Sequence, residues 1–274
     1  SDVYKRQAYK YIASNPRPMH NVEISCINEQ RCALWNFQND DLFMSKSSSF
    51  ANCTPYKLRP YQEDAFESIF VTKEDTKYAR SCIIDMCCAA GKTFVGSAIV
   101  IKFQMPTVII TTHCVSVQQW RIHLMSIGIN DIFVLEDDAC KCPTLPTIII
   151  TTYSMFATSS VRENSQHHML CMFTKVFDSL LILDEVHSAS AHTYQTVFSQ
   201  RSKCIIGLTA TLCREDDGID KLYKYIGPVS FTVSADMLIE EGYISGMNHI
   251  KVLTPLSSSA EPVSYTHLTL PTTS

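Results

Sequence analysis

The chain is 274 residues long and carries 23 Lys and Arg residues against 27 Asp and Glu residues, a formal net charge of −4 with neutral histidines. This balance excludes a uniformly basic surface for nucleic acid, so any DNA contact must come from a local track of residues. The 12 cysteines contain no CxxC pair at zinc spacing, and the C-K-C of Cys140 and Cys142 is better explained by two free, reduced thiols than by a metal site.

The two ends of the chain are related at the DNA level. Residues 2–7 back-translate as GAT GTG TAT AAG AGA CAG, whose reverse complement in its third frame spells residues 263–267. The same string resembles the end of a transposon used to prepare sequencing libraries. We therefore expect residues 1–7 and 263–274 to be adapter scars, and the chain to be an internal fragment of a longer protein.

Residues 8–54 differ in composition from the rest of the chain. They are richer in Asn, Ser and isolated aromatic residues, and SKSSS at 45–49 is typical of an exposed linker. The sequence predicts an N-terminal extension with a boundary near Thr54, followed by one large domain over residues 55–262.

Six short runs of β-branched and apolar residues follow, and each precedes a stretch that can form a helix. They are SCIIDM (81–86), PTVIITT (106–112), DIFVL (131–135), TIIITT (147–152), LLILDE (180–185) and KCIIGLT (203–209). Continuous apolar strands that alternate with helices predict an α/β fold, with a mostly parallel sheet covered by helices on both faces. Each run is far shorter than the roughly 20 residues of a membrane-spanning helix, so no membrane contact is expected.

Polar clusters stand at or directly after the ends of five of these runs. They are AAGKT, THCVSVQQW, TTYS, DEVH and TATLCRED. In open parallel sheets, ligands bind just past the carboxyl ends of the strands. The pattern therefore predicts one functional edge of the sheet.

The string CCAAGKT at 87–93 ends like a phosphate-binding loop. Gly91 lets the backbone approach a phosphate closely, and the predicted helix over residues 92–103 directs free N–H groups at it. Lys92 is expected to reach the β- and γ-phosphates of a nucleotide, and the Thr93 hydroxyl to bind Mg²⁺. Short Gly-Lys-Thr strings also occur by chance, so this motif needs a partner elsewhere in the chain.

LLILDEVH supplies that partner at the end of the fifth run. A buried strand that ends in two carboxylates is costly unless a cation or an ordered polar group lies there. Asp184 is expected to hold Mg²⁺, and Glu185 to orient and deprotonate the attacking water. The alternative, an exposed Asp-Glu pair that caps the following helix, fits less well with the apolar residues that precede Asp184.

The order of the motifs is more specific than any one of them. LRPYQ (58–62), AAGKT, VSVQQW, TTYSM, DEVH and LTATL follow one another as in superfamily 2 helicases. LTATLCREDD (208–217), YIGPVSF (225–231) and GYIS (242–245) resemble the XPB-type branch, and WNFQNDD (35–41) is similar to that family's approach to its first lobe. The resemblance extends over most of residues 22–254 and implies a RecA-like P-loop NTPase lobe at 55–262.

The resemblance implies a role for each residue that matches a family motif. Adenine contact is implied for Arg59 and Gln62, and phosphate binding for the loop residues Met86, Cys87, Cys88, Ala89, Ala90, Gly91, Lys92 and Thr93. Coupling of nucleotide state to DNA is implied for His187, Thr209 and Thr211, and DNA unwinding for the RED triplet Arg214, Glu215 and Asp216. At a strand-to-helix junction, a DNA phosphate is expected to contact Thr112, His113 and Ser116. Taken singly, several of these residues also fit ordinary surface or strand positions.

Two positions depart from the family's loop, which usually reads Pro-Cys-Gly-Ala-Gly-Lys-Thr. Cys87 stands in place of the proline and Ala89 in place of the first glycine. A positive φ at Ala89 would cost about 1 kcal/mol or more, whereas a negative φ would cost nothing. Because the lysine, the threonine and both acidic residues are retained, we expect Ala89 to adopt a negative φ in a functional loop.

The sequence thus predicts the first lobe of a DNA helicase or translocase that uses ATP and Mg²⁺. The family resemblance also implies DNA, a second RecA-like lobe and other TFIIH subunits as partners, and a nuclear location. Two alternatives stay open. One is a viral or restriction-type double-strand DNA translocase, and the other is a non-hydrolysing scaffold with a degenerate nucleotide fold.

Overall fold

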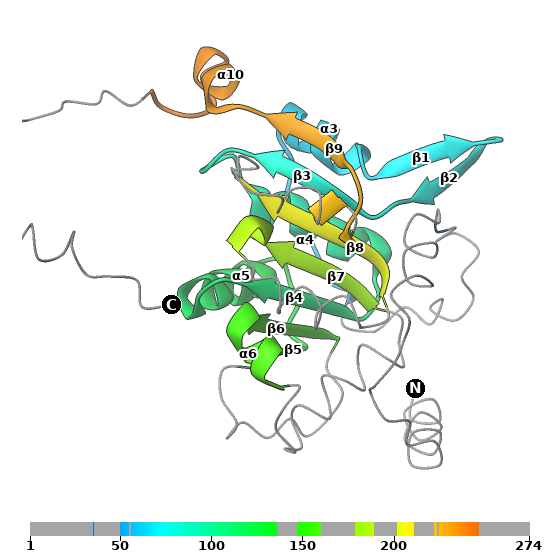
Figure 1. The fold of residues 1–274 in the computed structure, drawn as a ribbon, viewed down its shortest axis with the longest axis vertical. Helices are drawn as coiled ribbons and strands as arrows, with labels where there is room; N and C mark the ends of the chain where they lie inside the picture. Colours follow the sequence, from blue (N-terminus) through cyan, green and yellow to red (C-terminus); the bar gives the residue numbers. More distant parts are fainter. Residues whose placement is uncertain are drawn as a thin grey trace, which may run out of the picture.

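The computed structural model describes residues 35, 50–54, 56–135, 147–159, 179–188, 202–210, 222–223 and 225–246. Within these residues the domain is built on one seven-stranded sheet, to which a separate two-stranded hairpin is attached (Figure 1). No helix in the described part of the chain is both long and apolar enough to cross a bilayer.

The seven-stranded sheet is parallel at every strand pair. Its strands are β3 (Cys82–Met86), β4 (Thr107–Thr111), β5 (Ile132–Leu135), β6 (Ile148–Thr152), β7 (Ser179–Asp184), β8 (Ser202–Thr209) and β9 (Val229–Val233). Their spatial order is β5-β6-β4-β7-β8-β3-β9. The six predicted runs form β3 to β8 within one or two residues, so the predicted parallel α/β sheet is confirmed.

The central strands are buried on both faces, which explains their unbroken apolar sequences. Every residue of β4 and of β6 is buried. Alternate residues then enter two cores, one on each side of the sheet: Ile109 lies in the first, whereas Val108 and Ile110 lie in the second. β-branched side chains suit such a strand because their restricted rotamers fit the pleated surface.

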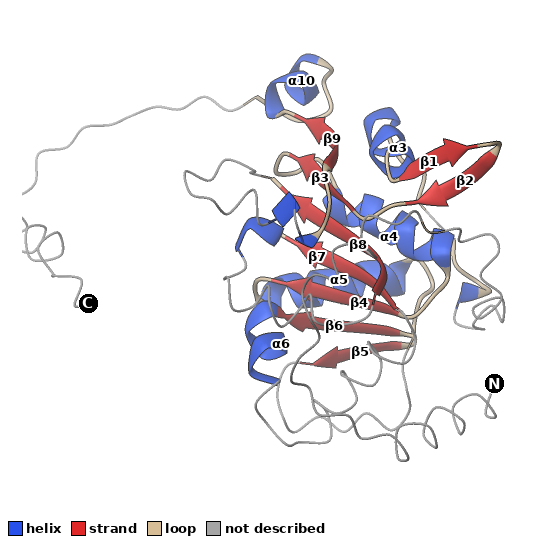
Figure 2. Ribbon diagram, turned by 45° about the vertical axis from the view of Figure 1, so that its right-hand side comes forward, coloured by secondary structure: helices blue, strands red, loops and turns tan. Residues whose placement is uncertain are grey.

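Helices cover both faces of the sheet. The first core includes buried residues of α3 (Pro60–Glu67), α4 (Lys92–Phe103) and α5 (Cys114–Ser126), and Figure 2 shows α4 and α5 running along the sheet. The second core includes residues of α6 (Tyr153–Ser159) and of the short 3-10 helix η3 (Val186–Ser188). α10 (Ala235–Glu240) follows β9 and begins with a Ser234 cap. The predicted helix over 92–103 coincides with α4.

The hairpin precedes β3. β1 (Phe70–Lys73) and β2 (Thr76–Ala79) pair antiparallel, and the two residues that join them, Glu74 and Asp75, both have positive φ. That backbone matches the right-handed twist of the two strands. Trp35, from the predicted extension, exchanges backbone hydrogen bonds of 2.8 and 2.9 Å with Ala79.

Candidate functional site

The loop after β3 turns sharply into α4. Gly91, the residue before the helix, has a φ of 83°, a left-handed conformation that favours glycine. A Cβ atom on Gly91 would also collide with the amide nitrogen of Gln62. Glycine is therefore required at this position both by the backbone conformation and by the close approach of α3.

Ala89 has a φ of 64°, so the expectation of a negative φ at this position is wrong. The neighbouring residue explains why the conformation persists. Ala90 is fully buried, and its carbonyl accepts hydrogen bonds from the Tyr61 hydroxyl at 3.0 Å and from the Gln62 amide at 2.8 Å. These contacts from α3 thus hold the loop in a left-handed turn that costs an alanine about 1–2 kcal/mol.

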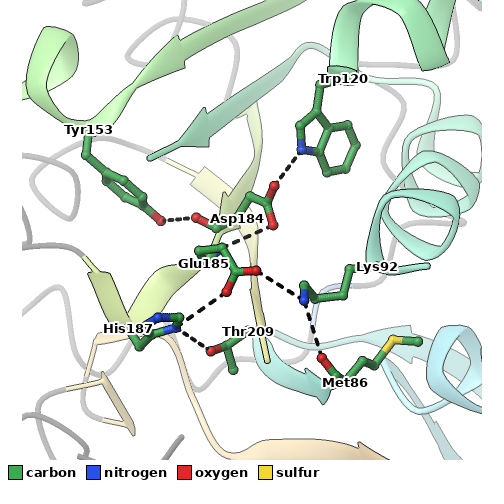
Figure 3. Close-up of polar contacts among 8 residues, drawn as sticks. All are labelled: Met86, Lys92, Trp120, Tyr153, Asp184, Glu185, His187 and Thr209. Carbon is green, nitrogen blue, oxygen red and sulfur yellow. Dashed lines mark hydrogen bonds and ion pairs between the residues drawn. The ribbon is translucent and has the colours of Figure 1, made fainter. Parts of the chain in front are cut away.

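Lys92 connects the loop to the end of β7. Its ammonium lies 3.1 Å from Oε1 of Glu185 and donates a 3.4 Å hydrogen bond to the Met86 carbonyl (Figure 3). The lysine side chain is only 11% exposed, so this charge pair is weakly screened by water. Lys92 and Glu185 are 93 positions apart in the chain. The fold brings these two predicted site residues together at one edge of the sheet.

The Asp184 carboxylate ends β7 and is held by two N–H donors. Oδ2 accepts from the Trp120 indole at 2.8 Å, and Oδ1 accepts from the Glu185 backbone at 3.1 Å. The Asp184 carbonyl also accepts from the Tyr153 hydroxyl at 3.1 Å, as Figure 3 shows. Burial raises the pKa of Asp184, and the Trp120 hydrogen bond opposes that rise. A bound cation would stabilise the charged carboxylate further.

Glu185 and His187 continue the site toward β8. Glu185 has a φ of 49°, and its Oε2 is buried without a hydrogen-bond partner among the described residues. That oxygen lies 3.5 Å from Nδ1 of His187, and the same nitrogen is 2.8 Å from the Thr209 hydroxyl. The structure therefore brings the acidic pair, His187 and Thr209 into one connected group.

Arg59 and Gln62 stand at the start of α3. Gln62 is buried, and its Oε1 accepts a 3.0 Å hydrogen bond from the Arg59 backbone. The Arg59 guanidinium donates to the Tyr243 carbonyl at 3.1 Å and lies 5.6 Å from the centre of that tyrosine ring. Tyr243 is part of the GYIS string, yet no site role was predicted for it.

The residues expected to contact DNA are only partly described. Thr112 and the exposed His113 follow β4, and Ser116 lies in the first turn of α5. Thr111, at the end of β4, donates to the His113 carbonyl at 3.3 Å. Predictions that fall outside the described residues concern Thr211, Arg214, Glu215, Asp216, Cys140 and Cys142.

Sequence reasoning missed three polar residues of the site besides Tyr243. Trp120 and Tyr153 both contact Asp184, and each stands within a motif that had been noted for other residues. Asp85 lies one residue before the end of β3, where burial raises its pKa while Lys92 and His187 oppose the rise. An aspartate inside the apolar string CIIDM was the available signal for this third carboxylate.

These groups fit a phosphate-bearing ligand that is accompanied by a divalent cation. The loop and Lys92 provide backbone N–H groups and a positive charge, while Asp184 and Glu185 provide carboxylate oxygens. The described residues contain no group of three His, Cys, Asp or Glu side chains that could hold a metal. Carboxylate oxygens are the protein ligands that Mg²⁺ uses, together with waters and phosphate oxygens.

Comparison with known proteins agrees with this arrangement. Residues 55–214 match the family model described as type III restriction enzyme, res subunit. A curated relative, the general transcription and DNA repair factor IIH helicase/translocase subunit XPB of Encephalitozoon cuniculi, is 31% identical over 80% of this chain and 32% of its own length. The Saccharomyces cerevisiae subunit XPB/SSL2 is also 31% identical, over 74% of this chain and 24% of its own length.

A solved structure supports the fold independently. The UvsW helicase from bacteriophage T4 matches with a TM-score of 0.50 at 13% identity, covering 64% of this chain and 60% of that one. At this identity the match bears on the fold alone, and it confirms the predicted RecA-like fold. The chain spans about a third of the length of the Encephalitozoon relative. Because the family model matches more than half of the 274 residues, the chain belongs to the family described as type III restriction enzyme, res subunit, and within it resembles XPB subunits.

Proposed function

We propose that residues 55–262 form the nucleotide-hydrolysing lobe of an ATP-dependent DNA helicase or translocase of the XPB type. The observation that carries the proposal is the meeting of Lys92, from the loop after β3, with the acidic end of β7. A lysine ammonium at a helix start beside two partly buried carboxylates suits phosphoryl transfer to water, in which catalysis rests on positioning and charge stabilisation.

The proposal assigns a chemical role to each site residue of the loop after β3 and of the end of β7. The N–H groups of the loop and the Lys92 ammonium bind the β- and γ-phosphates, and Thr93 and Asp184 hold Mg²⁺. When bound, Mg²⁺ neutralises charge on those phosphates. Glu185 orients the attacking water and accepts its proton on a carboxylate oxygen.

We assign recognition of the adenine base to residues at the start of α3. Arg59 and Gln62 provide donors and an acceptor beside the loop, and Gln62 contacts the loop directly through Ala90. This link lets adenine recognition influence the loop conformation. Tyr243, whose carbonyl and ring contact Arg59, belongs to the same side of the proposed site.

DNA and protein partners follow from the XPB resemblance. We assign DNA-phosphate contact to Thr112, His113 and Ser116, and coupling between nucleotide and DNA to His187 and Thr209, which share a 2.8 Å contact. The same resemblance assigns coupling to Thr211 and DNA unwinding to Arg214, Glu215 and Asp216. A second RecA-like lobe, other TFIIH subunits and a nuclear location complete the proposal.

Two alternatives to the XPB-type function can be tested. The matching family model is described by a restriction-enzyme subunit, which motivates a restriction-type double-strand DNA translocase outside TFIIH as the second candidate, whereas the curated relatives are TFIIH subunits and favour the XPB type. Both functions use the same nucleotide chemistry, and capture of other TFIIH subunits by the full-length protein would separate them. A scaffold that does not hydrolyse nucleotide is the third candidate, supported by the strained Ala89.

Glu185→Gln in the full-length protein tests the hydrolysis chemistry. The amide retains the size of the side chain but cannot accept the water's proton, so ATP binding should persist while phosphate release falls at least about 100-fold. Asp184→Asn should instead weaken binding only when Mg²⁺ is present. Parental turnover by Glu185→Gln would exclude the assigned role, and absence of ATP hydrolysis by the parent would favour the scaffold.

A further inference from the structure

Trp120 joins α5 to the acidic end of β7 across the interior of the domain. Its side chain is 1% exposed, and the indole N–H donates a 2.8 Å hydrogen bond to Oδ2 of Asp184. Figure 3 shows the indole approaching the carboxylate from the side opposite to His187. A large aromatic residue needs only packing to fill a core, whereas this one also aims its single polar atom at a site residue.

α4 is shaped to admit the indole. Gly96 lies one turn after Lys92, and a Cβ atom on it would come within 2.5 Å of Cη2 of Trp120. Glycine in a helix interior is less favourable than alanine. The helix that begins with Lys92 and Thr93 therefore contains the opening that lets the indole reach Asp184.

A neutral donor has a specific consequence for a carboxylate that is to bind a cation. An arginine or lysine in place of the indole would form an ion pair with Asp184 and reduce its attraction for a metal. The indole N–H restricts rotation of the carboxylate while leaving its negative charge in place. Together with the Glu185 backbone N–H on Oδ1, it fixes the carboxylate plane and leaves lone pairs on both oxygens.

We propose that Trp120 is a positioning residue that orients the Asp184 carboxylate toward the divalent cation bound with the nucleotide. The inference rests on the proposed function, in which Asp184 holds that cation. Residues that orient metal ligands typically contribute about 10- to 100-fold to metal affinity. Trp120→Phe keeps an aromatic ring but removes the N–H. It should therefore lower the affinity of the nucleotide-bound protein for Mg²⁺ by that factor.

The hydrogen bond can be tested without nucleotide. The chain has two tryptophans, so a ¹⁵N–¹H spectrum of the 274-residue protein contains two indole signals, and Trp35→Phe assigns them. Asp184→Ala should shift the Trp120 signal upfield, because the charged acceptor is lost, and leave the Trp35 signal in place. A Trp120 signal that does not move would overturn the inference.

The consequence for the cation is measured by titrating Mg²⁺ at fixed ATP analogue and following nucleotide binding. Trp120→Phe should need about 10- to 100-fold more Mg²⁺ for half-maximal binding, while its affinity without Mg²⁺ should equal the parent's. Trp35→Phe is the matched control and should need the parental Mg²⁺ concentration. An equal requirement in the two variants would overturn the inference.

A second variant guards against misfolding of Trp120→Phe. Gly96→Ala retains the tryptophan but displaces its ring, so it should shift the indole signal and raise the Mg²⁺ requirement in the same direction. If neither Gly96→Ala nor a folded Trp120→Phe changes the Mg²⁺ requirement, Trp120 has no positioning role. If the parent shows no Mg²⁺-dependent nucleotide binding, the proposed function itself fails, and the cation role fails with it.

Discussion

At the scale of single residues, the candidate site contains two non-glycine residues with left-handed backbones. Ala89 has a φ of 64° and Glu185 a φ of 49°. Such conformations cost about 1–3 kcal/mol each and persist where surrounding contacts hold them. At Glu185 the backbone N–H donates to Oδ1 of Asp184, so the strained residue contributes to orienting the neighbouring carboxylate.

Ala89→Gly should stabilise the protein by about 1 kcal/mol, because glycine adopts a positive φ without the steric cost that alanine bears. The unfolding temperature should then rise by about 2–4 °C. The nucleotide affinity should stay within about tenfold of the parent's, or roughly 1.4 kcal/mol. Ala90→Gly is the matched control, since Ala90 is buried and lacks a positive φ, and it should lower the unfolding temperature. If both variants lowered the unfolding temperature, the strain assigned to Ala89 would be absent.

At the scale of elements, α4 and α5 meet through Trp120 inside the domain and through an aromatic cluster near its surface. The cluster consists of Tyr56, Phe94 and His123, with ring centroids 4.7 to 5.2 Å apart. Phe94 directly follows Thr93, so the cluster packs against the first turn of α4, the helix that follows the loop after β3. Nε2 of His123 is buried without a hydrogen-bond partner among the described residues, and burial lowers the pKa of this imidazole.

The lowered pKa of His123 predicts loss of stability in mild acid. The unfolded chain, with an imidazole pKa of about 6.5, binds a proton more readily than the folded one as the pH falls. The stability contribution of the neutral ring is therefore complete above about pH 6.5 and declines below it. His123→Phe should show a smaller fall in unfolding temperature between about pH 7.5 and about pH 5.5 than the parent. Parallel pH profiles of the two proteins would contradict this expectation.

At the scale of the whole molecule, the order of the strands assembles the site. β8 separates β7 from β3, and all three strands run in the same direction, so their carboxyl ends lie along one edge. The Lys92–Glu185 pair crosses that edge from the end of β3 to the end of β7, beside Thr209 at the end of β8. In the proposed function, this arrangement lets one lobe bind nucleotide through its own residues.

Hydrolysis by the 274-residue chain alone should nevertheless be slow. The XPB resemblance implies that an arginine from a second lobe stabilises charge on the transferred phosphate, and such an arginine contributes on the order of 10³-fold or more. We expect the rate of phosphate release from ATP by the 274-residue chain to be lower than that of the full-length protein by about that factor, with or without DNA. Brisk DNA-stimulated release by the chain alone would refute the two-lobe arrangement.

The six strands from β3 to β8, the bounds of α4 and the order of the motifs could all be predicted from local sequence patterns. These features follow from local patterns, since runs of β-branched residues and a Gly-Lys-Thr string act through their immediate neighbours. The positive φ of Ala89 and the hydrogen bond from Trp120 to Asp184 became visible only in the folded domain. The first depends on α3 packing against the loop, and the second on an opening at Gly96 in a different helix. Contacts between residues far apart in the chain are set by how helices pack on the ordered sheet, which no local pattern specifies.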